Sequence, residues 1–145
     1  MQSSAILYLA ETDPEIPTPD VAIFADTGDE PEWVNRQVED LKRRSRIPIR
    51  VVRKHDTSLS EDVIARHNGM ASRFATIPAF ASDENGEPAP LRRQCTREYK
   101  VEPIEREVRR LLGYAPRKHV KHRVDCMIGI SFDEMDCPRF LYQGL

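Results

Sequence analysis

The residues best suited to chemistry form three polar blocks that lie far apart in the sequence. Gln2-Ser3-Ser4 opens a predicted helix, where serine hydroxyls and free backbone N–H groups can hold an anion. Asp26-Thr27-Gly28 follows a short apolar run, and Leu91 to Pro103 (LRRQCTREYKVEP) leads from a loop into another helix. Each block also has an ordinary structural explanation, since serines cap helices and charged residues cover solvated faces. A functional role therefore requires a fold that brings the blocks together.

Asp26 stands at the carboxyl end of a predicted strand. Val21 to Ala25 is an apolar run with β-branched and aromatic members, which is typical of a strand covered on both faces. Gly28 permits a positive φ or a close backbone approach, and Asp29 with Glu32 predicts a capping box for the next helix. Open α/β sheets bind ligands at such strand ends. Because the acids that follow would repel phosphate, Asp26 suits a ribose hydroxyl, a metal ion or a base edge.

The third block concentrates cations where a helix begins. Arg92, Arg93, Arg97 and Lys100 all lie near this helix start, where the helix dipole disfavours positive charge. A bound anion shared with the helix N-terminus would explain their presence. Cys95 lies among these cations, which favour a reactive thiolate and make it a candidate nucleophile, although a buried structural cysteine fits equally well.

Composition predicts a single globular domain in the cytoplasm. The 145 residues are 39% hydrophobic and 32% charged, and no apolar run approaches the roughly 20 residues that span a bilayer. The first residues lack the basic and apolar regions of a secretory signal. Cys95, Cys126 and Cys137 form no Cys-x-x-Cys pair, which favours reduced thiols over disulfides or a zinc site. We therefore expect a cytoplasmic protein with no membrane partner.

The net charge of −2 is distributed unevenly along the chain. Residues 11–40 hold ten acids and one base, whereas residues 91–123 hold eleven Lys or Arg against four Glu. Such a basic segment attracts phosphate-bearing partners, either nucleotides or nucleic acid. A solvated helix face followed by a basic loop is the plainer explanation.

Hydrophobic periodicity predicts an α/β fold. We expect helices over 2–12, 31–44, 60–67 and 101–112, with Ser60 capping the third and Gly113 ending the last. Strands are expected over 21–25, 47–53 and 124–131, a hairpin tip within 82–90, and a basic linker over 115–123. This alternation predicts a parallel sheet with crossover helices.

Three blocks, ADTGDEPEWV, QCTREYKVEPI and IGISFDE, resemble in this order the phosphoadenosine phosphosulfate (PAPS) reductase-like branch of the PP-loop adenine-nucleotide α-hydrolase superfamily. Phage and bacterial members of undefined substrate are the most similar. The likeness reaches about Glu134, which predicts a partial PP-loop domain over 1–134 and a divergent tail over 135–145. It implies a Rossmann-like parallel sheet with flanking helices that binds an adenine nucleotide.

The resemblance also implies which residues bind the nucleotide. In the family a glycine-rich loop ending in Ser-Ser or Ser-Thr holds phosphate, and Gln2-Ser3-Ser4 match the end of that loop. Asp26-Thr27-Gly28 match the second-strand motif, and Cys95-Thr96 with Lys100 resemble part of the reductase anion site. The late strand end is matched by Gly129, Ser131, Asp133 and Glu134. No residue is expected to be a metal ligand of the protein. The predicted nucleotide and phosphate site comprises Gln2, Ser3, Ser4, Asp26, Thr27, Gly28, Arg93, Thr96, Arg97, Lys100, Gly129, Asp133 and Glu134.

Both ends of the chain depart from the family pattern. The first strand and the loop glycines are absent before Met1, and relatives commonly have a valine there, so we hypothesise that Met1 is a GTG codon read as a start. The Glu-Cys-Gly tail that carries the reductase nucleophile is absent too, and Cys137 lacks that context. The paired cysteines of some relatives are missing, so no iron–sulfur cluster is expected.

The expected function is binding of ATP or PAPS, with an enzymatic reaction in the full-length form. Attack at the α-phosphate would use Mg²⁺ to offset the triphosphate charge. Reduction of the sulfonyl group would need a nucleophilic thiolate and a thioredoxin-like thiol donor. The missing tail favours the first reaction. The alternatives are a non-enzymatic truncated domain that binds nucleic acid through residues 91–123, and a fragment without function; a homo-oligomer is compatible with each.

Overall fold

The computed structural model describes residues 2–68, 80–82, 86, 88–90, 95–115 and 117–129. The predicted site residues Arg93, Asp133 and Glu134, Cys137 and the predicted tail over 135–145 lie outside this part. The elements in chain order are α1 (Gln2–Thr12), β1 (Ala22–Asp26), α2 (Glu32–Arg44), β2 (Ile49–Arg53), α3 (Leu59–His67), β3 (Phe80–Ser82), β4 (Pro88–Pro90), the π-helical turn η1 (Thr96–Val101) and α4 (Glu102–Leu111).

The centre of the fold is a β1–α2–β2 unit. The two strands pair in parallel, from Ala22 opposite Ile49 to Asp26 opposite Arg53, and α2 forms the crossover between them. A parallel pair needs such a crossover because the chain must return to the same end of the sheet. The α/β class with parallel pairing is therefore confirmed, for a small two-stranded parallel sheet.

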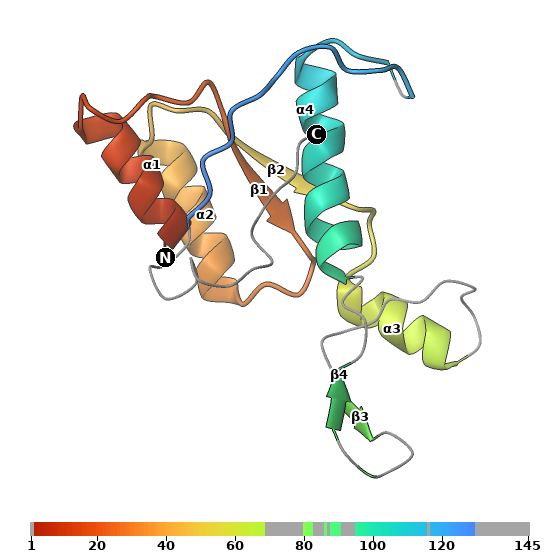
Figure 1. Cartoon of the computed structure of the whole chain (residues 1–145). Coiled ribbons are helices and arrows are strands. Elements are labelled where there is room, and N and C mark those ends of the chain that lie inside the picture. The colour runs from red at the N-terminus through yellow and green to blue at the C-terminus, as the bar shows by residue number, and fades with distance from the viewer. Residues whose placement is uncertain are drawn as a thin grey trace.

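Helices cover both faces of this sheet. In Figure 1, α1 and α2 lie on one side of β1 and β2, and α4 lies on the other. The first side contains the buried cluster of Leu7, Ala10 and Ile47, against which Leu41 of α2 packs. On the second side, Tyr99 of η1 is 1% exposed. The amphipathic faces predicted for α1 and α2 thus point to the sheet.

The last helix begins earlier than predicted and in a different form. The chain enters α4 through the wider turn of η1, a type of distortion that is common at functional sites. Pro103 is buried at the first turn of α4, where its missing N–H is tolerated. Gly113, with a φ of 74°, ends the helix as predicted. Leu111, the last residue of α4, is 40% exposed.

The predicted strand over 124–131 is wrong in its described part. Residues 124–129 form no strand, and Val124, Met127 and Ile128 are exposed. Their apolar pattern fits a strand only if a neighbour offers a backbone edge to pair with. Among the described residues, β1 pairs with β2 and β3 pairs with β4, and neither pair extends to this segment.

The predicted hairpin tip is confirmed. Phe80–Ser82 and Pro88–Pro90 pair antiparallel, and Gly86 between them has a φ of 82°. Proline is tolerated in such short edge strands because its missing N–H does not interrupt a central ladder. In the described residues, no helix is long and apolar enough to cross a membrane.

Candidate functional site

Three polar segments meet at the carboxyl end of the parallel strands. The first is residues 26–30, at the end of β1, and the second is residues 54–62, which follow β2. The third is residues 95–100, which comprise Cys95 and most of η1. Lys54 and Glu98 join the second segment to the third, with 2.7 Å between Nζ and Oε2. Figure 1 shows α3 and η1 at the end toward which the β1 arrow points. The fold therefore brings the second and third predicted blocks to one end of the sheet.

Asp26 binds an arginine from the neighbouring strand. Its Oδ2 accepts hydrogen bonds from Nε and Nη2 of Arg53, at 3.1 and 2.6 Å, and its Oδ1 accepts one from the Gly28 backbone at 2.7 Å. Arg53 faces Asp26 because both end their strands at the same register position. Sequence reasoning missed Arg53, although its place at the end of the second predicted strand was a usable signal.

Gly28 allows the loop after β1 to lie against the start of α3. Its φ is 85°, and a Cβ at this position would lie 2.8 Å from both Cα and Cβ of Ser58. The Leu59 backbone donates to the Thr27 carbonyl across the same contact, at 3.0 Å. The positive φ and the close approach predicted for Gly28 are both confirmed.

Asp29 caps a different helix from the predicted one. Its carboxylate accepts hydrogen bonds from Oγ and the backbone N of Ser60, both at 2.6 Å, in the first turn of α3. The hydrogen bond from the Ser60 hydroxyl holds the pKa of Asp29 below its usual value. Helix α2 instead has Pro31 at its N-cap and, in the described structure, no side-chain cap. The predicted capping box at α2 is wrong because the loop turns Asp29 toward α3.

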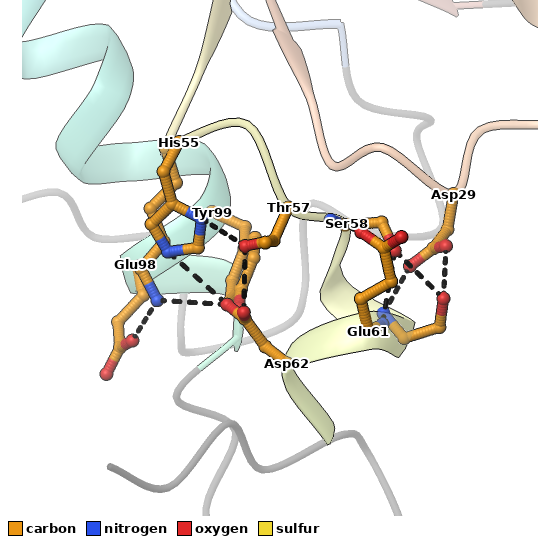
Figure 2. Close-up of polar contacts among 10 residues, drawn as sticks. Asp29, His55, Thr57, Ser58, Glu61, Asp62, Glu98 and Tyr99 are labelled. Atoms are coloured by element: carbon orange, nitrogen blue, oxygen red, sulfur yellow. Dashed lines mark hydrogen bonds and ion pairs between the residues drawn. The ribbon is translucent and has the colours of Figure 1, made fainter. Parts of the chain in front are cut away.

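A capping box does form, one helix later. The Glu61 backbone donates to Ser58 Oγ at 3.1 Å, and the Ser58 backbone donates to Glu61 Oε2 at 2.7 Å (Figure 2). Two free N–H groups are thus satisfied reciprocally. Ser58, and not the predicted Ser60, therefore caps α3, which begins at Leu59. The pattern Ser-x-x-Glu at 58–61 was the missed signal.

Asp62 is the centre of a hydrogen-bond network that holds η1. It accepts hydrogen bonds from the Tyr99 hydroxyl and, at 2.8 Å, from Thr57 Oγ1, and His55 Nε2 lies 3.3 Å from its Oδ2 (Figure 2). Burial acts to raise the pKa of Asp62, but the hydrogen bonds from Tyr99 and Thr57 lower it overall. Burial and the Asp62 carboxylate raise the pKa of Tyr99, so its phenol remains a donor.

Lys54 lies between this network and η1. Its ammonium is 2.7 Å from Glu98, 3.9 Å from Asp62 and 4.1 Å from the centre of the Tyr99 ring. A cation over an aromatic face is attracted by the ring quadrupole. Polar contacts therefore join the segment after β2, residues 54–62, to Glu98 and Tyr99 of η1. These contacts fix the position of η1 relative to the sheet.

The predicted anion-binding residues of η1 lie on its outer side. Thr96, Arg97 and Lys100 are exposed, and Cys95 is a half-buried free thiol. Arg97 pairs with Glu102 at 3.4 Å. Within the described part of the chain, no carboxylate forms an ion pair with Lys100. These residues are placed at the end of β1, with their polar groups open to solvent.

The first predicted block lies apart from this network. Ser3 is exposed at the start of α1, and Ser4 Oγ accepts a hydrogen bond from Gln37 of α2 at 3.1 Å. Gln2 is the first residue of α1, and Figure 1 shows the starts of α1 and α2 at the same end of the sheet as the end of β1. Gly129 is half-buried in the extended chain that follows residue 123.

One hollow on the described surface lies elsewhere. It has a volume of about 690 Å³ and follows one helix, α2, past Trp33, Arg36 and Arg43. Trp33 is 62% exposed there, so this is an open helix surface and not an enclosed cleft. In the same described residues, no group of three His, Cys, Asp or Glu side chains is arranged to hold a metal ion.

Comparison of the chain with protein-family models, with curated proteins and with solved structures found no match.

Proposed function

We propose that the chain is a Rossmann-like cytoplasmic domain that binds an adenine nucleotide, either ATP or PAPS, over the carboxyl ends of β1 and β2. The observation that carries the proposal is the delivery of two sequence-distant blocks, Asp26-Thr27-Gly28 and Thr96 to Lys100, to one end of a parallel β1–α2–β2 unit. Ligands of open α/β sheets lie at this end. The resemblance to PP-loop proteins supports an adenine nucleotide as the ligand.

The phosphate groups would lie against the outer side of η1. Lys100 and Arg97 are exposed cations there, and the Thr96 hydroxyl is exposed between Cys95 and Arg97. Arg97 can exchange its exposed carboxylate partner for a phosphate, since both accept the guanidinium fork. Ser3, Ser4 and the N-terminus of α1 offer further donors at the same end of the fold.

The nucleoside would lie nearer to β1. Asp26 Oδ2 already accepts both hydrogen bonds from Arg53, whereas Oδ1 accepts one from the Gly28 backbone and keeps a lone pair that can accept a ribose hydroxyl. Arg53 neutralises this carboxylate, so a nearby phosphate meets no net negative charge from Asp26. Asp26 therefore shapes the loop and can also contact the ligand.

Two reactions fit such a complex. In the first, an acceptor nucleophile forms a bond to the α-phosphorus and loses its proton, while the α–β P–O bond breaks and its electron pair leaves on pyrophosphate; Mg²⁺ on the ATP substrate offsets its charge. In the second, the Cys95 thiolate attacks the sulfonyl sulfur, and the S–O bond breaks to release the nucleotide. A dithiol donor of the thioredoxin type then releases sulfite and becomes the disulfide.

Equilibrium dialysis of radiolabelled ATP and PAPS against the chain tests this function. We expect one of them to bind, and Lys100→Ala to weaken its affinity about tenfold, the loss of roughly one charge-assisted hydrogen bond. Lys42→Ala is the matched control, because Lys42 pairs with Glu39 on α2, away from the strand ends. Pyrophosphate or sulfite release then distinguishes the reactions. Absence of binding, or an equal loss in both variants, would overturn the proposal.

A further inference from the structure

A second cationic surface lies at the other end of α4. The basic loop, residues 114–123, has the sequence YAPRKHVKHR and contains no acid. Its cations Arg117, Lys118, Lys121 and Arg123 are exposed, as are His119 and His122. In the described structure the ion pairs lie elsewhere, so none of these four cations has a carboxylate within 4.0 Å.

Hydrogen bonds from α4 and within the loop itself fix the conformation of the basic loop. Arg109 Nη2 donates to the carbonyls of Ala115 and Lys118, at 3.3 and 2.5 Å. The Tyr114 hydroxyl lies 2.7 Å from His122 Nδ1 and accepts a hydrogen bond from the Lys121 backbone at 3.2 Å. The Tyr114 and His122 rings also meet edge to face. Such preorganisation lowers the entropy cost of binding a partner.

The basic loop is separate from the candidate nucleotide site. In Figure 1 it follows the upper end of α4, whereas η1 and α3 lie at the lower end of that helix. A nucleotide at η1 therefore does not account for the unpaired cations of the loop. Like charges that repel one another in the free protein are stabilised when a polyanion covers them.

We propose that the basic loop binds the sugar–phosphate backbone of single-stranded nucleic acid. The cations neutralise phosphates, and the exposed rings of His119 and His122 between them can stack on unpaired bases. Duplex DNA is read by a helix or a β-ribbon in its major groove, and residues 117–123 form neither. Within the loop, the apolar residue between the cations is Val120, which is partly buried, so the loop itself presents no apolar face to a membrane surface. Exposed apolar side chains follow the loop at Val124, Met127 and Ile128, and the vesicle arm of the test below covers them.

Fluorescence anisotropy of the whole chain with labelled 20-nucleotide DNA and RNA strands tests this proposal. If four phosphates are neutralised, the logarithm of affinity falls with the logarithm of salt concentration with a slope of about −3, or about 50-fold between 50 and 200 mM salt. Lys118→Gln combined with Lys121→Gln makes the slope shallower by about 1.4, because two phosphate contacts are lost. Tyr114→Phe weakens binding without changing the slope, because it loosens the loop but removes no charge. The DNA and RNA arms show which strand binds more tightly.

The matched control is Lys42→Gln combined with Arg43→Gln, which removes the same charge from two side chains that pair with Glu39 and Asp40 on α2. We expect this variant to keep the wild-type slope, and an excess of ATP to leave the strand bound. An equal loss of slope in the control, displacement by ATP, or equally tight binding of phosphatidylserine vesicles or polyglutamate would overturn the proposal.

Discussion

At the scale of single residues, Gly28 is a position at which the backbone conformation and a close neighbour both require glycine. Its φ of 85° lies in the left-handed region, and the missing Cβ is what allows Ser58 to approach. Any other residue would be strained in its backbone and would also collide with the start of α3. The contact between the loop after β1 and the loop after β2 therefore depends on this glycine.

Gly28→Ala is expected to lower the free energy of unfolding by about 3 kcal/mol, since the cost of the left-handed backbone adds to the clash at 2.8 Å. Urea unfolding measures this loss. Gly113→Ala is the control, because Gly113 also has a positive φ but has nothing within 4 Å of an added Cβ. It should cost about 1 kcal/mol. Equal losses in the two variants would show that the Ser58 contact contributes nothing.

At the scale of elements, η1 is fixed by residues that come from β2 and α3. Tyr99 is buried beneath it and donates to Asp62, and Lys54 pairs with Glu98. Because η1 also carries Thr96, Arg97 and Lys100, this junction determines where the candidate anion-binding residues stand. Disruption of this junction should therefore displace the candidate anion-binding residues as well as lower the stability of the fold.

Stability should depend on pH through Asp62. Its pKa is lower in the folded chain than the value of about 3.9 for an unfolded aspartate, so the unfolded chain takes up the proton first as pH falls. The stabilisation is fully present above about pH 5 and is lost as pH falls through the folded pKa. Asp62→Asn should lower the unfolding free energy at pH 7 by about 2 kcal/mol and reduce the loss of stability on acidification.

Asp40→Asn is the control for this prediction. Asp40 lies on α2 and pairs with Arg43 and Arg44, whose side chains are largely exposed. Removing an exposed partner should change stability by less than about 0.5 kcal/mol. Urea unfolding of the wild type and both variants at pH 7 and pH 3 measures the effect, because pH 3 lies well below the unfolded pKa. A wild-type acid sensitivity that Asp62→Asn leaves unchanged would contradict the assignment to Asp62.

Sequence periodicity predicts the elements of this fold better than the partners of their side chains. Apolar spacing and turn residues predict both bounds of α1 correctly. They predict the bounds of α2, β1 and β2 to within one or two residues. The cap of α2 was mispredicted because Asp29 binds Ser60, 31 residues away across the Gly28 contact. The cap of α3 was mispredicted because Ser60 was preferred to the local Ser-x-x-Glu pattern at 58–61. The predicted strand over 124–131 failed because strand formation needs a partner edge, which local pattern does not supply.

The candidate site was predictable in its position but not in its internal bonds. Strand-end logic correctly placed Asp26-Thr27-Gly28 at the carboxyl end of a parallel strand, and the fold adds the contact of β1 with η1, the segment of Lys100. The pairing of Asp26 with Arg53, and the network around Asp62, depend on strand register and on burial of Tyr99. Both are properties of tertiary packing, so no local spacing could have shown them.

At the scale of the whole molecule, charge is arranged along α4. In Figure 1, η1 leads into the beginning of α4 and the basic loop follows its end, so the cations of the two segments lie at opposite ends of this helix. Glu107 in the middle of the helix pairs with Arg50 of β2 and with Arg110. A helix fixed to the sheet in this way would hold a nucleotide and a nucleic acid strand at opposite ends of one rigid element.

The stability of the whole molecule should depend on a small apolar core beneath α1. Leu7 is 8% exposed and packs in the cluster that joins α1 to the sheet and α2, whereas Leu9, two residues later, is 41% exposed. Leu7→Ala leaves a cavity that few neighbours can fill, so we expect a loss of about 3 kcal/mol and a fall in Tm of roughly 10 °C.

Leu9→Ala removes the same atoms from the outer face of α1 and should cost less than about 1 kcal/mol. Because domains of this size unfold cooperatively, Leu7→Ala should shift the helical circular dichroism signal and the near-ultraviolet signal of the aromatic residues to the same lower midpoint. Thermal melts followed at both wavelengths measure this. If the two midpoints separate, or if Leu9→Ala is as damaging as Leu7→Ala, the cluster beneath α1 does not determine the stability of the whole molecule.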